Sequence, residues 1–344
     1  MTLTTDTTLA TQRIQLDHGT GATLSGELVA FIAETLGEVY IGEMEDSAVL
    51  PVEGSRIAMT TDSFVVDPPF FGNGDIGKIA VCGTVNDLAV SGATPRYLTL
   101  GLILETGLPF DHLFRVLTSI RETAREAGVR IVCGDTKVVR AGEADQLYLN
   151  TSGVGFFSRE PLRMAAVRPG DAVIVSGPLG NHTVHLLSIR EGLGFESRVL
   201  SDCAPLNTMI EGLFAAVPAE SIRSMRDVTR GGLSAVLHEY ASSLGKGIVI
   251  DTPTLPIQHE TAMAADMLGI NPLHCANEGC LAIFVDPGAT EAVLTALRAH
   301  EYGRHAVAIG EITETDGAAV ILRDADGRES TLQPLRGAEL PRLC

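Results

Sequence analysis

The last residue of the chain is a cysteine, and a thiol at a free chain end is a candidate reactive group. Cys344 ends a segment, residues 335–344, that contains Gly337 and Pro341. Extended at about 3.3 Å per residue, this segment reaches roughly 30 Å, so we expect a mobile tail that brings the thiol to a neighbouring active site. The alternative is a frayed terminus whose cysteine has no role. Prenylation is excluded, because that signal needs a cysteine where Pro341 stands.

Carboxylates recur as short interruptions of apolar stretches. Asp46 precedes the apolar run 48–50, Asp62 closes the strand expected at 56–61, and Asp87 interrupts the apolar helix expected at 76–90. An ionised carboxylate in such a setting is costly unless it is paired or bound to a metal. Each alone is more often a cap or turn residue, but their recurrence favours a metal site.

Further polar residues stand at the ends of later elements. Asp135 follows the strand expected at 129–133, and Lys137 lies two residues on, a pair that either serves a metal and a phosphate or forms a surface ion pair. Asn150 lies in the strand expected at 147–157. Asp227 precedes the glycine-rich start of the helix expected at 233–244, a geometry suited to phosphates and Mg²⁺.

Two other residues are candidates for acid–base or phosphate chemistry. His18 opens the flexible loop His18-Gly-Thr-Gly21, which either approaches a phosphate or leaves a solvated histidine. Glu278 stands at the entrance of the strand expected at 280–285, where a carboxylate faces a cleft or caps a turn. The group His274, Cys275 and Cys280 lacks a second pair of ligands, so we interpret these cysteines as core thiols and not as a zinc site.

The composition of the 344 residues limits the possible partners. A formal net charge of −18 argues against binding to nucleic acid or an anionic membrane, and a bare polyphosphate would need metal ions. No apolar run approaches the roughly 20 residues of a membrane span, and the polar start lacks the apolar core of a signal peptide. The six cysteines lie mostly in apolar stretches, as reduced thiols do. We therefore expect a cytoplasmic protein.

Alternating strand and helix patterns predict two domains. The polar, proline-bounded stretch 159–169 separates them. The boundaries we expect are a disordered extension at 1–15, an N-terminal domain at 16–160, a C-terminal domain at 161–334 and the tail at 335–344.

Eight stretches, in this order along the chain, carry a resemblance to a known family. They are His18-Gly-Thr-Gly21, Thr60-Thr-Asp-Ser63 with Asp67-Pro68, Gly77-Lys-Ile-Ala80, Asn86-Asp-Leu-Ala-Val-Ser-Gly92, Gly134-Asp-Thr-Lys-Val138, Arg226-Asp-Val-Thr-Arg-Gly-Gly232, Ala276-Asn-Glu-Gly279 and Pro341-Arg-Leu-Cys344. The set resembles HypE, the hydrogenase maturation factors that make the cyanide ligands of nickel–iron hydrogenase. Related PurM-like families are aminoimidazole ribonucleotide synthetase, selenophosphate synthetase and thiamine monophosphate kinase. Ala22 and Leu343 depart from the pattern, where glycine and isoleucine are usual.

The resemblance implies a two-domain PurM-like ATP-binding fold, with an α/β N-terminal domain, an α+β C-terminal domain and a flexible tail. ATP would lie between the domains, and the N-terminal sheet would pair across a homodimer. The implied Mg²⁺ ligands are Asp46, Asp62, Asp87 and Asp227. The implied ATP-binding residues are Thr61, Asp62, Asp87, Asp135, Lys137, Asn150 and Asp227.

The resemblance also implies a reaction. Cys344 would accept a carbamoyl group from the partner HypF, ATP would activate the amide oxygen, and loss of phosphate would leave a thiocyanate for the HypC–HypD complex. Lys137 would offset phosphate charge. Glu278 is the first candidate for the base that takes the nitrogen protons, and His18 is the second.

Three alternatives stay open from the sequence. A selenophosphate synthetase typically has a reactive cysteine or selenocysteine in its N-terminal loop, whereas the first cysteine here is Cys82. A purine-pathway synthetase would not need a terminal thiol. A non-catalytic scaffold would bind nucleotide and a protein partner without turnover.

Overall fold

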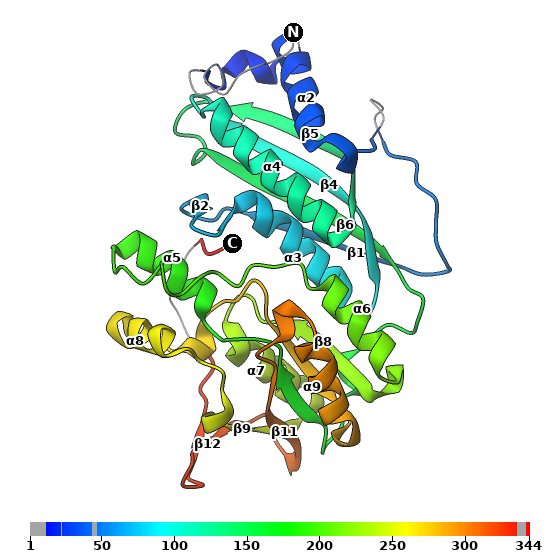
Figure 1. Ribbon diagram of the computed structural model, residues 1–344, viewed down its shortest axis with the longest axis vertical. Helices are drawn as coiled ribbons and strands as arrows, with labels where there is room; N and C mark the ends of the chain where they lie inside the picture. Colours follow the sequence, from blue (N-terminus) through cyan, green and yellow to red (C-terminus); the bar gives the residue numbers. More distant parts are fainter. Residues whose placement is uncertain (1–11, 22, 43–46, 336–341) are drawn as a thin grey trace.

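The computed structural model describes residues 12–21, 23–42, 47–335 and 342–344, which form two sheets with helices packed on them (Figure 1). The first sheet has the order β1-β6-β4-β5, and only β4 and β5 run parallel. Its strands are β1 (Ile57–Phe64), β4 (Thr94–Glu105), β5 (Arg130–Val139) and β6 (Leu147–Phe156). A small hairpin of β2 (Phe70–Phe71) and β3 (Gly74–Asp75) precedes the helix α3 (Ile76–Val90).

Helices cover one face of this first sheet. The helix α3 packs on β1 and β6, while α4 (Phe110–Ala127) packs on α3, and α2 (Thr23–Leu36) packs on α4 (Figure 1). The Asp75 carboxylate accepts hydrogen bonds from the N–H groups of Gly77 and Lys78, which defines the start of α3. Gly128 ends α4 in the left-handed conformation, with φ of 69°.

The second sheet has seven strands in the order β13-β12-β9-β11-β7-β10-β8. They are β7 (Ala172–Val175), β8 (Ile222–Asp227), β9 (Lys246–Asp251), β10 (Leu281–Val285), β11 (Val307–Asp316), β12 (Val320–Arg323) and β13 (Glu329–Thr331). One face packs on α7 (Gly232–Leu244), and the other packs on α6 (Asn207–Ala216) and α9 (Thr290–Arg298). The helices α5 (Asn181–Glu191) and α8 (His259–Leu268) lie together at one side (Figure 1).

Helix α3 belongs to both domains. Its N-terminal part lies in the core of the first sheet, whereas Ala89 and Val90 pack with α6 and β8 of the second domain. The buried Asn86 side chain donates to Ala204 O at 3.1 Å and accepts from Leu206 N at 2.8 Å. This paired contact satisfies two backbone groups that would otherwise be buried without partners.

Several boundaries differ from the sequence prediction. The strand predicted to end at 61 continues to Phe64, and the strand predicted to end at 133 continues to Val139. Asp62 and Asp135 therefore lie inside strands and not at their ends. The helix α6 and the strand β8 were not predicted. Residues 12–15 are not disordered, because the buried Ile14 pairs its backbone with residues 107 and 108.

The sequence leaves open whether the predicted mobile tail rests inside or outside the cleft, and in the structure its described end, residues 342–344, lies inside. Leu343 is buried and Cys344 is half-buried, and both pack against the core of the first domain. Among the described residues, no helix has the length and apolarity needed to cross a bilayer.

We predict that Asn86→Ala lowers the free energy of unfolding by about 2 kcal/mol, because it leaves a buried N–H and a buried carbonyl unpaired. Urea denaturation followed by circular dichroism measures the change. The matched control is Asn73→Ala, since Asn73 makes the same two-bond contact with Ser201 but is exposed, so water can replace the amide. Equal losses in the two variants would contradict the prediction.

Candidate active site

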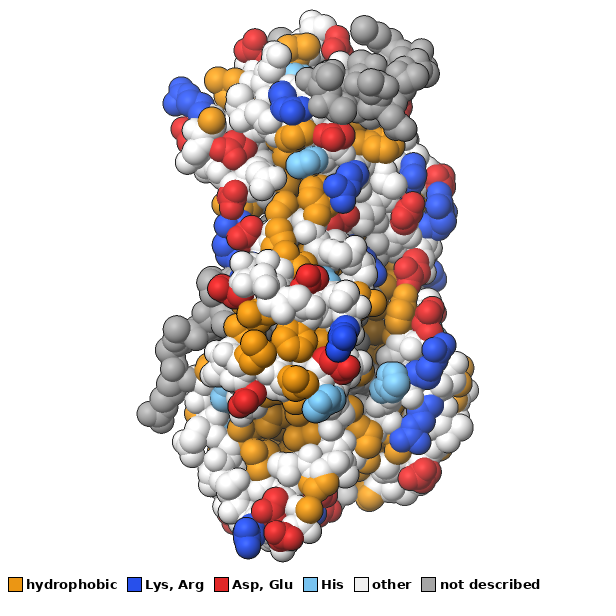
Figure 2. Space-filling view, turned by 60° about the vertical axis from the view of Figure 1, so that its left-hand side comes forward, with side chains coloured by type: hydrophobic (Ala, Val, Ile, Leu, Met, Phe, Trp, Pro, Cys, Tyr) orange, Lys and Arg blue, Asp and Glu red, His pale blue; other side chains and the backbone are white. Residues whose placement is uncertain are grey.

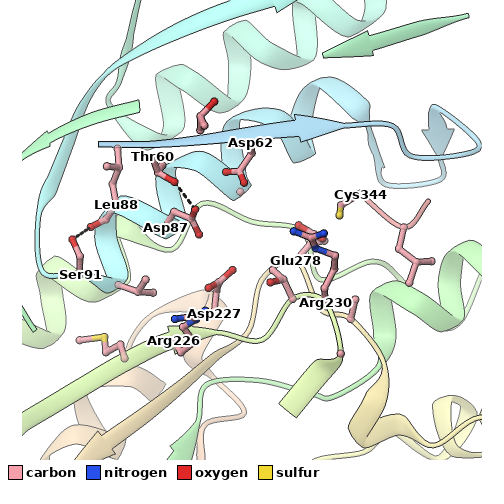
Figure 3. A pocket seen from close by; sticks show the side chains of 18 of the residues that line it. Thr60, Asp62, Asp87, Leu88, Ser91, Arg226, Asp227, Arg230, Glu278 and Cys344 are labelled. Atoms are coloured by element: carbon pink, nitrogen blue, oxygen red, sulfur yellow. Dashed lines mark hydrogen bonds between the residues drawn. The ribbon is translucent and has the colours of Figure 1, made fainter. Parts of the chain in front are cut away.

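A cleft of about 1760 Å³ lies between the two domains (Figure 3). Strand β1 and helix α3 line one side, and β8 with the loop after it lines the other. Residues 274–278 and the end of the tail close the remaining side. Figure 3 shows Leu88 and Ser91 at one end, three aspartates in the middle, and Glu278, Arg230 and Cys344 at the opposite end. The cleft thus has an apolar end, an acidic centre and a thiol end.

The acidic centre consists of Asp62, Asp87 and Asp227. Asp62 lies on the face of β1 that packs on α3, where it accepts a hydrogen bond from Thr84 Oγ1 at 3.2 Å. Asp87 breaks the apolar pattern of α3 and accepts from Thr60 Oγ1 at 2.8 Å. Asp227 is the last residue of β8 and reaches the same space from the other domain (Figure 3).

Burial raises the pKa of all three carboxylates, and repulsion from Asp87 adds to the shift at the other two. Burial, followed by repulsion from Asp87, raises the pKa of Asp62 and raises the pKa of Asp227 to about 6. Burial also raises the pKa of Asp87, although its hydrogen bond with Thr60 opposes the shift. A carboxylate cluster that is destabilised in this way favours a bound cation.

The donor set fits Mg²⁺ that arrives with a polyphosphate. Hard carboxylate oxygens suit this ion, and their mutual repulsion would be relieved by it. Within the described part of the chain, no group of three or more His, Cys, Asp or Glu side chains forms a ready-made metal site. Mg²⁺ typically uses one or two carboxylates with waters and substrate phosphates, so a preformed cage is not required.

The thiol end contains a buried carboxyl group with no hydrogen-bond partner on one oxygen. Asp202 accepts from the Glu278 N–H at 3.1 Å and fixes the loop that carries Glu278, while Glu278 Oε1 has no partner. Burial, with the nearby acidic groups, raises the pKa of Glu278 well above its usual range. Such a group is available to a ligand that enters the cleft.

The Cys344 thiol faces Glu278. Burial, together with the negative charge of Glu278, raises the pKa of Cys344 to about 12, and Arg230 partly opposes the shift. Figure 3 shows the Arg230 guanidinium beside Glu278 and on the side of Cys344. The docked thiol is therefore protonated and a poor nucleophile at neutral pH.

Four predicted ligands lie on the opposite face of the first sheet. Because Thr60 and Asp62 face α3, the Thr61 side chain points the other way, where it accepts from Ser152 Oγ at 2.9 Å. The strand register places Asn150, Asp135 and Lys137 on that same face. Asp135 and Lys137 form an exposed ion pair at 2.9 Å. Of these four residues only Thr61 borders the cleft, and none of the four side chains lies on the face that carries Asp62.

Two further predicted residues are not in the cleft. His18 lies in the 3-10 helix Leu16–Gly19, where its ring packs on Phe110 and bonds to the backbone of Gln15. Asp46 lies outside the described residues.

Sequence reasoning missed Arg230, His182 and Arg190. Arg230 lies in the motif Arg226-Asp-Val-Thr-Arg-Gly-Gly232, in which only Asp227 was predicted to bind a ligand. His182 and Arg190 contact the backbone of the tail, which no side-chain pattern reveals.

Comparisons with known proteins agree with this architecture. The family models for the AIR synthase related protein match residues 44–157 with the N-terminal domain and residues 168–323 with the C-terminal domain. The fold and the site define the chain as a two-domain AIR synthase-related protein.

Individual relatives identify the family within this class of proteins. Carbamoyl dehydratase HypE of Escherichia coli K12 is 43% identical over 339 residues, covering 96% of this chain and 99% of the relative. The crystal structure of HypE in complex with ATP has a TM-score of 0.90 at 39% identity and covers 96% of this chain and 99% of that one. A HypE–HypF complex has a TM-score of 0.78 at 39% identity, over 91% and 100% of the chains. The chain belongs to the HypE family of carbamoyl dehydratases.

We predict that Asp227→Asn stabilises the ligand-free protein at pH 7.5, by on the order of 2 kcal/mol. The folded pKa is raised above the unfolded value, so the carboxylate costs stability above pH 6, and this cost shrinks as the pH falls towards 4. Chemical denaturation at pH 7.5 and pH 5 measures the gain, which should be smaller at pH 5. Exposed Asp326→Asn is the control and should change little. A loss of stability at pH 7.5 would show that Asp227 is structural.

Proposed function

We propose that this chain binds ATP along the cleft and uses it to dehydrate an S-carbamoyl group on Cys344 to a thiocyanate. The observation that carries the proposal is the placement of the terminal thiol in the same cleft as three aspartates and beside an unpartnered carboxyl oxygen of Glu278. The base of ATP would lie at the apolar end near Leu88, and the triphosphate would lie at the aspartates. The γ-phosphate would then point toward Cys344.

The chemistry follows from the poor leaving ability of an amide oxygen. Attack of the carbamoyl oxygen on the γ-phosphorus releases ADP, and the oxygen then leaves as phosphate. The nitrogen loses its two protons, and the S–C(O)–NH₂ group becomes S–C≡N. Mg²⁺ held at Asp62, Asp87 and Asp227 would neutralise phosphate charge.

Glu278 is suited to take the nitrogen protons. Its raised pKa makes the ionised carboxylate a stronger base than an exposed glutamate, and Oε1 has no competing donor. Arg230, on the side of Cys344, is placed to balance negative charge that develops at the phosphorylated oxygen (Figure 3). The chain itself thus supplies the base and a cation.

Two partners would serve this reaction. A HypE relative forms a complex with HypF, which we propose as the carbamoyl donor. Because the docked thiol is protonated and half-buried, transfer to it needs the tail to leave the cleft. The HypC–HypD complex is the proposed acceptor of the cyanide group.

We also propose a homodimer that pairs the uncovered faces of two N-terminal sheets. That face carries exposed apolar side chains, including Met59 at 71% and Ile103 at 42% exposure. Asp135 and Lys137 extend from the same face, so a second copy would place Lys137 next to the partner's nucleotide. This arrangement gives the predicted phosphate-binding role of Lys137 to the neighbouring subunit.

Mass spectrometry of Cys344 tests the reaction. After incubation with HypF, carbamoyl phosphate and ATP, we expect the wild type to carry thiocyanate and Cys344→Ala to carry nothing. Glu278→Gln should accept the carbamoyl group but retain it, because glutamine keeps the shape and removes the basicity. The two adducts differ by one water. Dehydration by Glu278→Gln at the wild-type rate would remove Glu278 as the base.

Sedimentation tests the homodimer. Met59→Glu should yield monomers, because a charge buried between the paired apolar faces is left without a partner. Met267→Glu is the matched control, since Met267 is similarly exposed, at 65%, but lies on α8. A dimeric Met59→Glu variant would refute this interface.

A further inference from the structure

The three described residues at the chain end are held by backbone hydrogen bonds and by the Arg342 side chain, which donates to Val65 O at 2.8 Å and to Asp145 Oδ2 at 2.6 Å. Val65 N donates to Cys344 O at 3.0 Å, and Asp67 N donates to Arg342 O at 3.2 Å. This spacing is that of a short antiparallel pairing directly after β1. The tail thus extends the first sheet by one short strand-like segment.

Helix α5 approaches the same segment from the second domain. His182 Nε2 lies 2.7 Å from Leu343 O, and Arg190 donates to Arg342 O and Asp67 O. His182 and Arg190 are two turns apart on one helix. They therefore bind two successive carbonyls of the tail, Arg342 O and Leu343 O, and the chain after β1 binds Arg342 O and Cys344 O through its backbone.

The surroundings of His182 fix its tautomer. Cys203 N donates to Ser201 Oγ at 3.2 Å, so the Ser201 hydroxyl is free to donate to His182 Nδ1, 2.8 Å away. The other ring nitrogen then carries the hydrogen that Leu343 O accepts. Burial lowers the pKa of His182, which keeps the ring neutral, as this chain of bonds requires.

This buried network of Ser201, His182 and Leu343 O is complete only when the tail is docked. Without the tail, the Nε2–H of His182 would lose its protein acceptor in the interior. With the tail docked, each member has a partner, and the Leu343 side chain fills the adjoining core.

We propose that α5 carries a binding site for the C-terminal tripeptide Arg342-Leu343-Cys344, in which His182 and Arg190 are positioning residues that set the Cys344 side chain against Glu278. The role of this site in dehydration rests on the proposed function, whereas the binding of the tail does not. Carbamoyl transfer takes place with the tail released and does not need the site. The site recognises main-chain carbonyls, so it accepts the tail before and after its thiol is modified.

The test uses four full-length variants. His182→Leu and Arg190→Met remove the two contacts, and His182→Gln restores a donor of similar reach. His185→Leu is the matched control, because His185 is a buried histidine one turn along α5 that also packs on Phe71 but bonds to Val199 O and not to the tail.

Two measurements on each variant decide the proposal, and the carbamoylation rate and the ATP affinity serve as controls. The first is the rate at which N-ethylmaleimide labels Cys344 without nucleotide, followed on the terminal peptide. The second is a single turnover of the pre-carbamoylated protein with ATP. We expect His182→Leu and Arg190→Met to label about tenfold faster and dehydrate about tenfold slower, with carbamoylation not slowed and ATP affinity within about twofold of wild type. His182→Gln should recover most of both effects.

Wild-type labelling and dehydration in His182→Leu and Arg190→Met would overturn the proposal, as would equal effects in His185→Leu. If His182→Leu does not fold, Arg190→Met decides, because Arg190 is only partly buried in the last turn of α5. If the wild type fails to dehydrate the carbamoyl group on Cys344, the proposed function is wrong. The labelling rates still show whether α5 binds the tail.

Discussion

The sharing of helix α3 between two domains is the constraint on which the site depends. The helix is apolar on nearly all sides because it packs against the first sheet and against α6 and β8 of the second domain. Asn86 then fixes its register through two backbone groups of the second domain. With α3 fixed on both sides, Asp87 is held at a set position between Asp62 and Asp227.

This rigid frame explains how unfavourable electrostatics can persist. A carboxylate near others in a partly dry cleft would normally move toward solvent. Asp62 and Asp227 lie on strands and Asp87 on a clamped helix, so none can move away without disturbing a core. A cation that binds with phosphates would relieve this repulsion, and the relief would strengthen its binding.

Much of the architecture could be predicted from the sequence, because long periodic segments determine it. The bounds of α3 agree with the prediction, those of α7 differ from it by one residue, and the motifs identified the aspartates that meet in the cleft. Strand ends were less predictable: β1 and β5 continue through polar residues because neighbouring strands pair with them. Polar residues in an exposed strand look like the end of a strand when only one chain segment is considered.

The faces of the sheet and the place of the tail could not be predicted for a different reason. Whether Lys137 shares a face with Asp62 depends on registers across four strands, and one residue of slip reverses the answer. The position of Cys344 depends on backbone carbonyls that every sequence has. The contacts of His182 and Arg190 with the tail therefore depend on the tertiary structure and could not be predicted from the sequence.

The antiparallel pairing of the tail with Val65–Asp67 has a consequence for competition. Because the tail is tethered to the protein whose cleft it fills, it acts as an intramolecular ligand with an effective concentration in the millimolar range. Any partner that must take hold of Cys344 competes against that concentration. The docked tail is held by a few hydrogen bonds, one ion pair between Arg342 and Asp145, and one buried leucine, so a partner has a limited number of contacts to replace.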